Sequence, residues 1–556
     1  MSKLEAQKAL EQRTEALGAA LLEPYDDPTR RKSQASVIVE FCGDFDLFRA
    51  DDEAYAAVMI EGRRQTVALR SMAMRHELSR RYYQATKSVA GKQAIEDALG
   101  VLTGRAIHEG GNRPVHTRIA AFNNDIFIDL CDEAWRAIHV NSSGWRIVNE
   151  PPVHFIRRRG MLPLPDPRHG GTVNDLRRFI NVADDTDFRR IVGWLVQGLR
   201  PRGPYPILAL NGEQGSAKST ASRLVRSLID PNAVMLRTAP RDERDLVISA
   251  RNGWCLAFDN LSGLPPWLSD SLCRLSTGGG FSARQLYSDA DEILIDVSRP
   301  VVINGLDAIA TRPDLADRSV VVTLELIQDC HRRTEGALWR EFAAAAPGIL
   351  GALLDATACA LANVHSVRLA ILPRMADHAV WLEAASPALN WPPGQYVDEY
   401  IRARNAIVAS AADASPVSSM LMSFIDKCGS WSGTASALLA ELNREADSQV
   451  TRSRQWPNNA IAMGNEITRQ APALRARGYT VERLPGHKNG RLIKLGLIDK
   501  SLSPSSSRVP SSAVEGGTDG DGGDDVLRTI PKFVRTPEAP DSGFATRAAH
   551  ERIAVL

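Results

Sequence analysis

The stretch PILALNGEQGSAKSTASRLVRSLI, residues 206–229, decides the fold of the central part of this chain. Its apolar residues 207–210 predict a strand, and the segment after Lys218 predicts a helix that stops at Asp230 and Pro231. Between them lies a loop of glycines and small or polar residues: Gly212, Glu213, Gln214, Gly215, Ser216 and Ala217. Glycines let the backbone N–H groups of such a loop face a phosphate, and the following helix adds the positive end of its dipole. The order strand, loop, helix therefore predicts a phosphate-binding site.

Polar residues at the start of the predicted helix supply the rest of this site. Lys218 is expected to reach the β- and γ-phosphates of ATP, and the Ser219 hydroxyl is expected to ligate Mg²⁺. Thr220 and the loop residues complete the predicted nucleotide contacts. Ala217 stands where a glycine usually precedes the lysine, and a right-handed conformation in the first helical turn would accommodate it. The alternative for the whole stretch is a chance Gly/Ser turn before a helix.

A second apolar strand, WCLAFDN at 254–260, ends in a carboxylate. Asp259 is expected to hold Mg²⁺, directly or through water. The alternative is a strand-end turn or a helix-cap residue. The next residue, Asn260, can orient a water molecule but cannot take its proton, so hydrolysis is expected to be slow or to use another acid. Asp242 and Glu243 are the candidates for that acid.

A third apolar strand ends in Asn304, whose amide can lie between the γ-phosphate and the attacking water. Arg318 precedes the next strand, VVVTLEL, and is the first candidate for an arginine finger that projects into a neighbouring subunit's site. Arg312 is the second candidate. The alternative for Arg318 is an ion pair within its own chain, with Asp314 or Asp317.

The composition limits the class of protein. The chain has 556 residues, 44% of them apolar, which is enough for three or four domains with cores of their own. Its net charge of +1 excludes a uniformly basic nucleic-acid-coating protein, so a nucleic-acid site would be a local patch. Its seven cysteines form no Cys-x-x-Cys pair, which argues against a zinc ribbon or a disulfide framework. No apolar run reaches the ~18 residues of a membrane span, and the N-terminus carries acids, so we expect a cytoplasmic protein without a membrane partner.

Elsewhere the patterning predicts a multidomain α/β fold. Residues 37–42 and 54–60 have strand character within an α+β segment that ends at a Pro-rich stretch near 165. Strand and helix alternate from 206 to about 324, which favours a mostly parallel sheet. The predicted plan is a helix and linker at 1–35, an α+β collar-like domain at 36–165, a core at 170–328, a helical lid at 329–412, a winged helix at 416–498 and a disordered tail at 500–556.

The segment 416–498 has the rhythm of a winged helix, because three predicted helices precede a hairpin with a Gly-bounded turn. Basic residues gather on its third helix and its wing: Arg469, Arg475, Arg477, His487, Lys488, Arg491 and Lys494. Such a cluster suits phosphate contacts along a DNA duplex or fork. The alternative is a protein-docking module with a solvated basic face.

In its glycine-containing loop and its strand-end residues Asp259 and Asn304, the chain resembles the AAA+ ATPases of helicase superfamily 3. The likeness is greatest to the helicase part of phage- and poxvirus-type primase-helicases. The stretch LCRLSTGGGFSARQLYSD, residues 272–289, carries the same resemblance. The resemblance implies a β-hairpin that projects into a ring channel and grips single-stranded DNA, with Arg274 and Arg284 as contacts. The predicted turn at 289–291 is acidic, where the family has a basic residue. Arg374 in the helical lid is the candidate for a second sensor of the nucleotide, or is a plain surface residue.

The N-terminal segment carries a pair of alternating acids, Asp44 and Asp46, with Asp125 and Asp129 further along. Alternation along a strand would place the pair on one face, as a two-metal site requires. Because no convincing partner histidine accompanies them, we favour a collar for oligomerisation or partner docking over a primase.

The sequence therefore predicts an ATP-dependent DNA helicase or translocase, in which ATP is hydrolysed between the subunits of a ring, expected to be a hexamer. It would act in the replication of a phage or mobile element, with a separate primase as a candidate partner. The alternative is an ATP-switched DNA-binding initiator or regulator without unwinding activity. Asn260 and the acidic turn favour the alternative, whereas Arg318 and the three glycines at 278–280 favour the motor.

Overall fold

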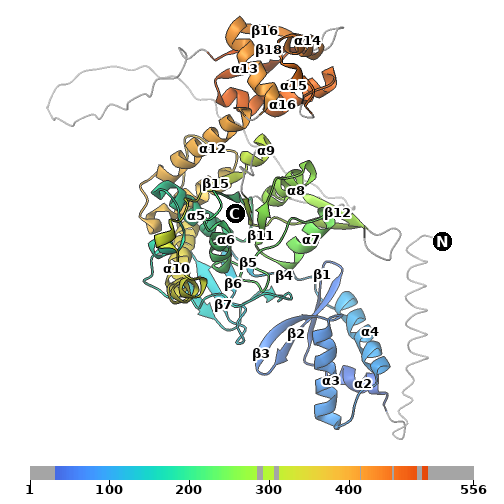
Figure 1. The fold of residues 1–556 in the computed structure, drawn as a ribbon. Coiled ribbons are helices and arrows are strands. Elements are labelled where there is room, and N and C mark those ends of the chain that lie inside the picture. The colour runs from blue at the N-terminus through green and yellow to red at the C-terminus, as the bar shows by residue number, and fades with distance from the viewer. Residues whose placement is uncertain are drawn as a thin grey trace, which may run out of the picture.

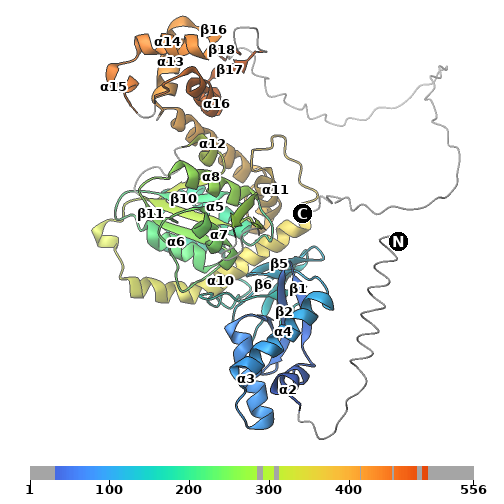
Figure 2. The same cartoon turned by 90° about the vertical axis from the view of Figure 1, so that its right-hand side faces the viewer.

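The computed structural model of the chain describes residues 32–284, 292–305, 312–413, 415–453, 456–484 and 491–498. Several predicted features lie outside the described residues: the helix before residue 32, the hairpin turn at 289–291, His487, Lys488 and the tail at 500–556. Figures 1 and 2 show an N-terminal unit, a central body that holds the parallel sheet, and an end domain that follows the long helix α12 (Gln395–Asp413).

The N-terminal unit is a three-stranded sheet packed on helices. Its elements are α2 (Gln34–Glu40), β1 (Asp46–Ala50), β2 (Glu53–Ile60), β3 (Arg63–Ala68), α3 (Met72–Thr86) and α4 (Lys92–His108). The antiparallel meander β1-β2-β3 buries Ala54 and Ala56 against these helices, and β2 confirms the strand predicted at 54–60. The strand predicted at 37–42 is wrong, because Ser33 caps a helix there and Ile38 enters the core. Capping and burial outweigh the strand propensity of the β-branched residues.

A four-stranded antiparallel sheet, β5-β6-β7-β8, follows the N-terminal unit. Its strands are β5 (Ile119–Phe122), β6 (Asp125–Asp129), β7 (Ala137–Asn141) and β8 (Gly144–Val148), and two short strands, β4 (Val115–His116) and β9 (His154–Phe155), pair with each other. Isoleucines of β6 and β7 pack into the same hydrophobic core as the helices of the central body. The boundary predicted near 165 therefore does not separate two cores, and the N-terminal domain predicted at 36–165 is divided.

Arg118, directly before β5, ties this sheet to the central body. Its Nε donates to Asp230 Oδ1 at 3.0 Å, and both side chains are completely buried. Its other guanidinium nitrogens donate to three backbone carbonyls. Asp230 Oδ2 in turn accepts the backbone N–H groups of Trp254 and Cys255. Every charged atom of the pair thus has a partner, as a buried ion pair requires.

The central sheet is parallel, with the strand order β11-β14-β10-β15. Its strands are β10 (Ile207–Asn211), β11 (Leu256–Leu261), β14 (Val301–Gly305) and β15 (Ser319–Thr323). The predicted strands before the glycine-containing loop, before Asp259 and before Asn304 are confirmed as β10, β11 and β14. Because β14 lies between β10 and β11, the carboxyl ends of all three meet at one edge of the sheet.

Helices and one hairpin surround this sheet. They are η1 (Val173–Phe179), α5 (Asp185–Gly198), α6 (Lys218–Ser227), α7 (Glu243–Asn252), α8 (Pro266–Thr277), α9 (Pro313–Ala316) and the antiparallel pair β12 (Gly280–Arg284) and β13 (Glu292–Asp296). The predicted hairpin is thus present in its paired strands. Figure 2 shows α5, α6 and α7 against the sheet.

The helical block consists of η2 (Asp329–His331), α10 (Glu335–Asn363), α11 (Ala376–Ala385), η3 (Ser386–Leu389) and α12. By length and composition alone, α10 is apolar enough to cross a membrane, and it is the one such helix among the described residues. However, 56% of its most apolar window is buried inside the protein, where it packs on η1, α11, β7 and β8. We therefore interpret α10 as a core helix.

The end domain has a hydrophobic core of its own. Its elements are α13 (Pro416–Cys428), β16 (Ser430–Thr434), α14 (Ala435–Glu445), α15 (Ser448–Thr451), α16 (Ala460–Ala476), β17 (Tyr479–Arg483) and β18 (Leu492–Leu497). The three main helices and the two hairpin strands agree with the predicted order. The segment between the first two helices, for which no strand is predicted, forms β16, which adds a third strand to the sheet β16-β18-β17.

Candidate nucleotide site and arginine cleft

The loop between β10 and α6 has a backbone that its glycines make possible. Gly212 has a φ of +151° and Gly215 a φ of +91°. A Cβ at Gly212 would lie 2.6 Å from Ser216 Oγ and 2.7 Å from the Leu324 carbonyl oxygen, so glycine alone fits there. Glu213 and Gln214 at the crest of the loop are exposed. The loop is thus open to a ligand along its outer side.

Ala217, immediately before α6, departs from the sequence prediction. It has φ 61° and ψ 32°, a left-handed conformation, rather than the right-handed one expected of a residue in the first turn. A left-handed conformation costs an L-residue with a Cβ roughly 1–2 kcal/mol. The loop therefore holds a strained residue at the position that directs the first N–H groups of α6.

Lys218 lies folded back over the loop. Its Nζ donates to the carbonyl oxygens of Gly212 and Glu213, both at 2.7 Å. Burial lowers the pKa of Lys218 below its ordinary value, and the charge of Asp259 partly opposes this shift. The ammonium group is therefore already placed inside the curve of the loop, where an incoming phosphate would exchange for the two carbonyls.

Ser219 and Asp259 lie together at the edge of the sheet. The Ser219 hydroxyl, on the first turn of α6, donates to Asp259 Oδ1 at 2.7 Å. Among the described residues no group of three or more His, Cys, Asp or Glu could hold a metal ion. One hydroxyl and one carboxylate nevertheless fit Mg²⁺, which keeps several waters and is bound by one or two carboxylates plus substrate phosphates.

Asn304 links the ends of β11 and β14 to α6. It is 1% exposed, its Oδ1 accepts the backbone N–H of Asn260 at 2.9 Å, and its Nδ2 donates to Ser222 Oγ at 2.8 Å. Asn260 itself has a left-handed backbone, and its side chain is exposed beside Asp259. Both ends of the Asn304 amide are thus hydrogen-bonded within the protein, to the end of β11 and to α6.

The two acids considered as a base are engaged elsewhere. Asp242 caps α7 by accepting the N–H of Asp245 at 2.9 Å, and Glu243 pairs with Arg274 on α8. Neither contact involves the loop or Asp259. Asn260 therefore remains the polar group next to Asp259 that could orient a water.

Five arginines line a cavity of about 620 Å³ between the central body and the end domain, here called the arginine cleft. They are Arg274, Arg312, Arg318, Arg374 and Arg469. The backbone carbonyl of Asp314 accepts a hydrogen bond from Arg318 at 2.8 Å. The aspartate side chains instead pair with Arg312 and Arg374. The alternative predicted for Arg318, an ion pair with Asp314 or Asp317, is thus not seen.

The register of the sheet places this cleft away from the loop of the same chain. Ser319 at the start of β15 pairs with Ile207 at the start of β10, whereas the loop follows the end of β10. Arg374 Nε lies 3.3 Å from Asp317 Oδ2, at the start of β15. Arg374 therefore does not face the loop of its own chain, and its role as a second sensor of the nucleotide stays a prediction. Its ion pair with Asp317 holds it beside Arg318 instead.

The residues predicted to contact DNA do not form one surface. Arg274 and Arg469 line the arginine cleft. Arg475 donates to the Val481 carbonyl at 2.9 Å, which fixes α16 to β17. Arg491 is exposed directly before β18, at the turn end of the hairpin, and the backbone of Arg284 pairs with Glu292 at the end of β12. Lys488 lies outside the described residues.

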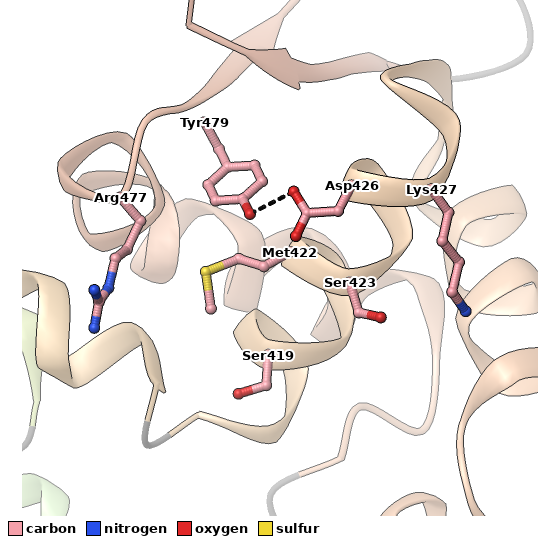
Figure 3. Close-up of a pocket in the computed structure, with 7 residues that line it drawn as sticks. All are labelled: Ser419, Met422, Ser423, Asp426, Lys427, Arg477 and Tyr479. Atoms are coloured by element: carbon pink, nitrogen blue, oxygen red, sulfur yellow. Dashed lines mark hydrogen bonds between the residues drawn. The ribbon is translucent and has the colours of Figure 1, made fainter.

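A second hollow, which the sequence did not indicate, lies on the end domain (Figure 3). It has a volume of about 610 Å³ and is lined by Ser419, Met422, Ser423, Asp426, Lys427, Arg477 and Tyr479. The Tyr479 hydroxyl donates to Asp426 Oδ1 at 2.7 Å, which joins β17 to α13. Burial, and then this hydrogen bond, raise the pKa of Tyr479 to about 12.

The acids considered for a two-metal site are held by separate partners. Arg81 engages Asp44, and Arg64 and Arg113 engage Asp46. The two downstream acids are engaged by His139 and Arg157. Among the described residues the structure does not bring the four together, and the collar stays a prediction.

The fold and the site together define a multidomain α/β protein with a parallel sheet and a loop-and-carboxylate site at its edge. Residues 173–388 match the family described as the actinomycete integrative conjugative element replication protein, and residues 417–508 match the AICE RepA C-terminal domain. The two matches together cover more than half of the chain, and they support a role in the replication of a conjugative element.

Solved structures of the NrS-1 C-terminal region are similar over much of the chain. One apo structure has 9% identity and a TM-score of 0.36, and covers 84% of this chain and 99% of that one. Another has 10% identity and a TM-score of 0.35, with 84% and 100% covered. None of the curated proteins compared with the chain matches it.

Proposed function

We propose that this chain is an ATPase that couples ATP hydrolysis to DNA unwinding or translocation during replication of a conjugative element. The observation that carries the proposal is the hydrogen bond between Ser219 and Asp259 beside the glycine-containing loop. This arrangement supports a nucleotide site of the P-loop type, in which Lys218 binds the β- and γ-phosphates. Ser219 and Asp259 would hold Mg²⁺, which supplies charge neutralisation for phosphoryl transfer.

Different residues of the chain would orient the phosphates and position the metal-binding carboxylate. The backbone N–H groups of 212–217 and the N-terminus of α6 orient the phosphates. Asn304 fixes the ends of β11 and β14 relative to α6, and so positions Asp259 and the exposed amide of Asn260. Since Asn260 orients a water without accepting its proton, slow turnover is part of the proposal.

Assembly into a ring is the second part of the proposal. Arg318 and the loop stand at opposite ends of adjacent parallel strands. A head-to-tail contact, which generates rings when it closes, could bring Arg318 of one copy to the loop of the next. We propose a hexamer in which Arg318 completes the neighbour's site and the β12–β13 hairpin faces single-stranded DNA.

The end domain would act as a winged helix on duplex or forked DNA. Its order of helices and its three-stranded sheet support this proposal, as does the exposed Arg491 at the turn end of the hairpin. Exposed cations of this kind contribute phosphate contacts that weaken with added salt.

Steady-state ATPase measurements on the full-length protein, with and without single-stranded DNA, test the function. Lys218→Ala should abolish turnover, whereas the matched control Lys92→Ala, an exposed lysine on α4, should not. Stimulation by single-stranded DNA would support a motor. If the wild-type protein does not bind ATP at millimolar concentration, the proposed ATPase function is wrong.

The second candidate function is an ATP-switched DNA-binding initiator or regulator that does not unwind DNA. The absence of a carboxylate at position 260 favours it. In that case turnover is slow and indifferent to single-stranded DNA, and ATP changes the affinity of the protein for duplex DNA.

A further inference from the structure

The arginine cleft unites residues for which the sequence predicts separate roles. Arg274 and Arg469 are predicted DNA contacts, Arg318 a predicted finger and Arg374 a predicted sensor, yet all four line one cavity. The central body, the helical block and the end domain each contribute to it. Figure 1 shows α9 and α12 between the central sheet and the end domain, where this cavity lies.

In the part of the chain that the structure describes, carboxylates pair with every arginine of the cleft except Arg318. Three aspartates line the cavity with the five arginines, and two glutamates outside it, Glu243 and Glu466, pair with Arg274 and Arg469. Arg312 engages two of these aspartates, and Arg374 with Arg404 engages the third. Arg318 donates to the backbone carbonyl of Asp314, and its buried Nε has no partner among the described residues. A guanidinium with an open, desolvated donor favours an anion with several oxygens, such as a phosphate.

Helix α16 forms one wall of the cleft. It packs on α9 and α12, and Arg477, which follows it, donates to the carbonyl oxygen of Ala409 at 3.2 Å. Thr468, Arg469 and Pro472 of α16 line the cavity together with Arg318. A space of about 620 Å³ has the size of a small-ligand pocket. A cavity of this volume can hold the phosphates of one nucleotide but cannot enclose a duplex.

We propose that the arginine cleft receives the phosphates of a nucleotide held by a second copy of this chain, and that Arg469 is one of the phosphate contacts. This inference rests on the proposed function and extends it, because it makes the end domain part of the neighbour's nucleotide site. The cleft and the loop lie at opposite ends of adjacent strands, so a head-to-tail neighbour can face the cleft with its loop. Docked in this position, Arg469 of α16 contacts the nucleotide, and the contact with duplex DNA is left to the hairpin beside Arg491.

Single substitutions in the full-length protein test the contact. Arg469→Ala is compared with Arg444→Ala, because both arginines pair with a glutamate three residues earlier, but Arg444 lies on α14 outside the cleft. We expect kcat to fall about 100-fold or more in Arg318→Ala and about 5- to 10-fold in Arg469→Ala, since arginine contacts to a transferring phosphate act mainly on kcat. Arg444→Ala should keep wild-type turnover, and the affinity of each variant for ATP should change little.

Mixing of variants separates a contact between copies from damage to the fold. Lys218→Ala copies cannot use ATP, but they offer an intact cleft to a neighbour. When they are added to Arg469→Ala protein, turnover should rise several-fold for each copy that retains Lys218. When they are added to wild-type protein, turnover for each such copy should not rise. The inference is wrong if Arg469→Ala behaves as Arg444→Ala, if mixing restores nothing, or if Arg469→Ala loses duplex binding with unchanged turnover. Wild-type protein whose turnover is absent or independent of Lys218 would instead refute the proposed function, and the inference with it.

Discussion

Ser219 Oγ and Asp259 Oδ1 are 2.7 Å apart, a hydrogen bond that ties the first turn of α6 to the end of β11. Two groups that would share a cation are thus held together before any ligand arrives. Such preorganisation lowers the cost of ordering the site when a ligand binds.

Asp259→Asn keeps an acceptor for Ser219 but removes the charge. We expect the Mg²⁺-dependent part of ATP affinity to fall at least tenfold, because a neutral amide attracts a hard cation poorly. Titration of the protein with a fluorescent ATP analogue, at zero and 5 mM Mg²⁺, measures this. Asp245→Asn, an exposed acid on α7, is the control. An equal response to Mg²⁺ in both variants would show that Asp259 does not face the metal.

Ala217→Gly should stabilise the protein, because glycine adopts a left-handed backbone without the cost that alanine bears. The strain of roughly 1–2 kcal/mol exceeds the roughly 0.4–1 kcal/mol of extra chain entropy that glycine loses on folding. The free energy of unfolding should therefore rise by up to about 1.6 kcal/mol. Urea unfolding measures it.

The same substitution four residues later provides the control. Ala221 is 3% exposed within α6 and has no strain to relieve. Ala221→Gly should destabilise the protein by about 1 kcal/mol. If both substitutions destabilise equally, the left-handed conformation of Ala217 is not the native one.

Loss of one partner from the buried ion pair of Arg118 and Asp230 should be costly. Arg118→Met leaves an unpaired buried carboxylate, and we expect a loss of about 3–5 kcal/mol in the free energy of unfolding. The double variant Arg118→Met with Asp230→Leu should lose less than the sum of the two single variants, because they share one interaction. Tryptophan fluorescence during urea unfolding measures these losses, and one of the tryptophans, Trp254, donates its backbone N–H to Asp230. Additive losses would contradict the coupling.

One buried histidine, His378, and one half-buried histidine, His116, predict a loss of stability in mild acid. Burial lowers the pKa of His378 to about 3 and that of His116 to about 4, against an ordinary value of 6.5. Between pH 4 and 6.5 the unfolded chain therefore binds more protons than the folded one. Stability falls as pH falls through this range, by up to about 1.4 kcal/mol per pH unit for each histidine.

His378→Gln tests this prediction, because glutamine does not titrate and can still hydrogen-bond the Tyr396 hydroxyl. Urea midpoints at pH 7.0 and 5.0 measure the effect. The variant should show a smaller difference between the two values than the wild-type protein does. An unchanged difference would mean that His378 is protonated in the folded protein.

Local patterns were sufficient to predict the parallel sheet and the candidate nucleotide site. The strands before Gly212, Asp259 and Asn304 are continuous apolar runs, and the parallel order brings their ends together. The segment 37–42 misled us, since a cap at Ser33 and the burial of Ile38 decide its conformation and neither is visible in its propensities.

The arginine cleft could not be predicted, because its residues come from α8, the segment around α9, the helical block and α16. Each arginine, taken alone, has a plausible local role. Their convergence depends on the docking of α16 on α9 and α12, which no short motif encodes. Asp230 was equally hidden, since the sequence suggested only that it ends a helix, whereas it is the buried partner of Arg118.

The sharing of one core by the β5–β8 sheet and α10 sets where this protein can be shortened. Removal of everything before residue 165 would strip the isoleucines of β6 and β7 from α10 and leave Asp230 without its cation. A cut between α4 and β4 would remove the unit's helices together with the sheet face that they cover. The other face of that sheet packs Phe48 and Tyr55 on Ile156, so this cut would uncover Ile156 and Val115. Trimmed versions that begin near residue 112 should therefore also replace Ile156 with a polar residue.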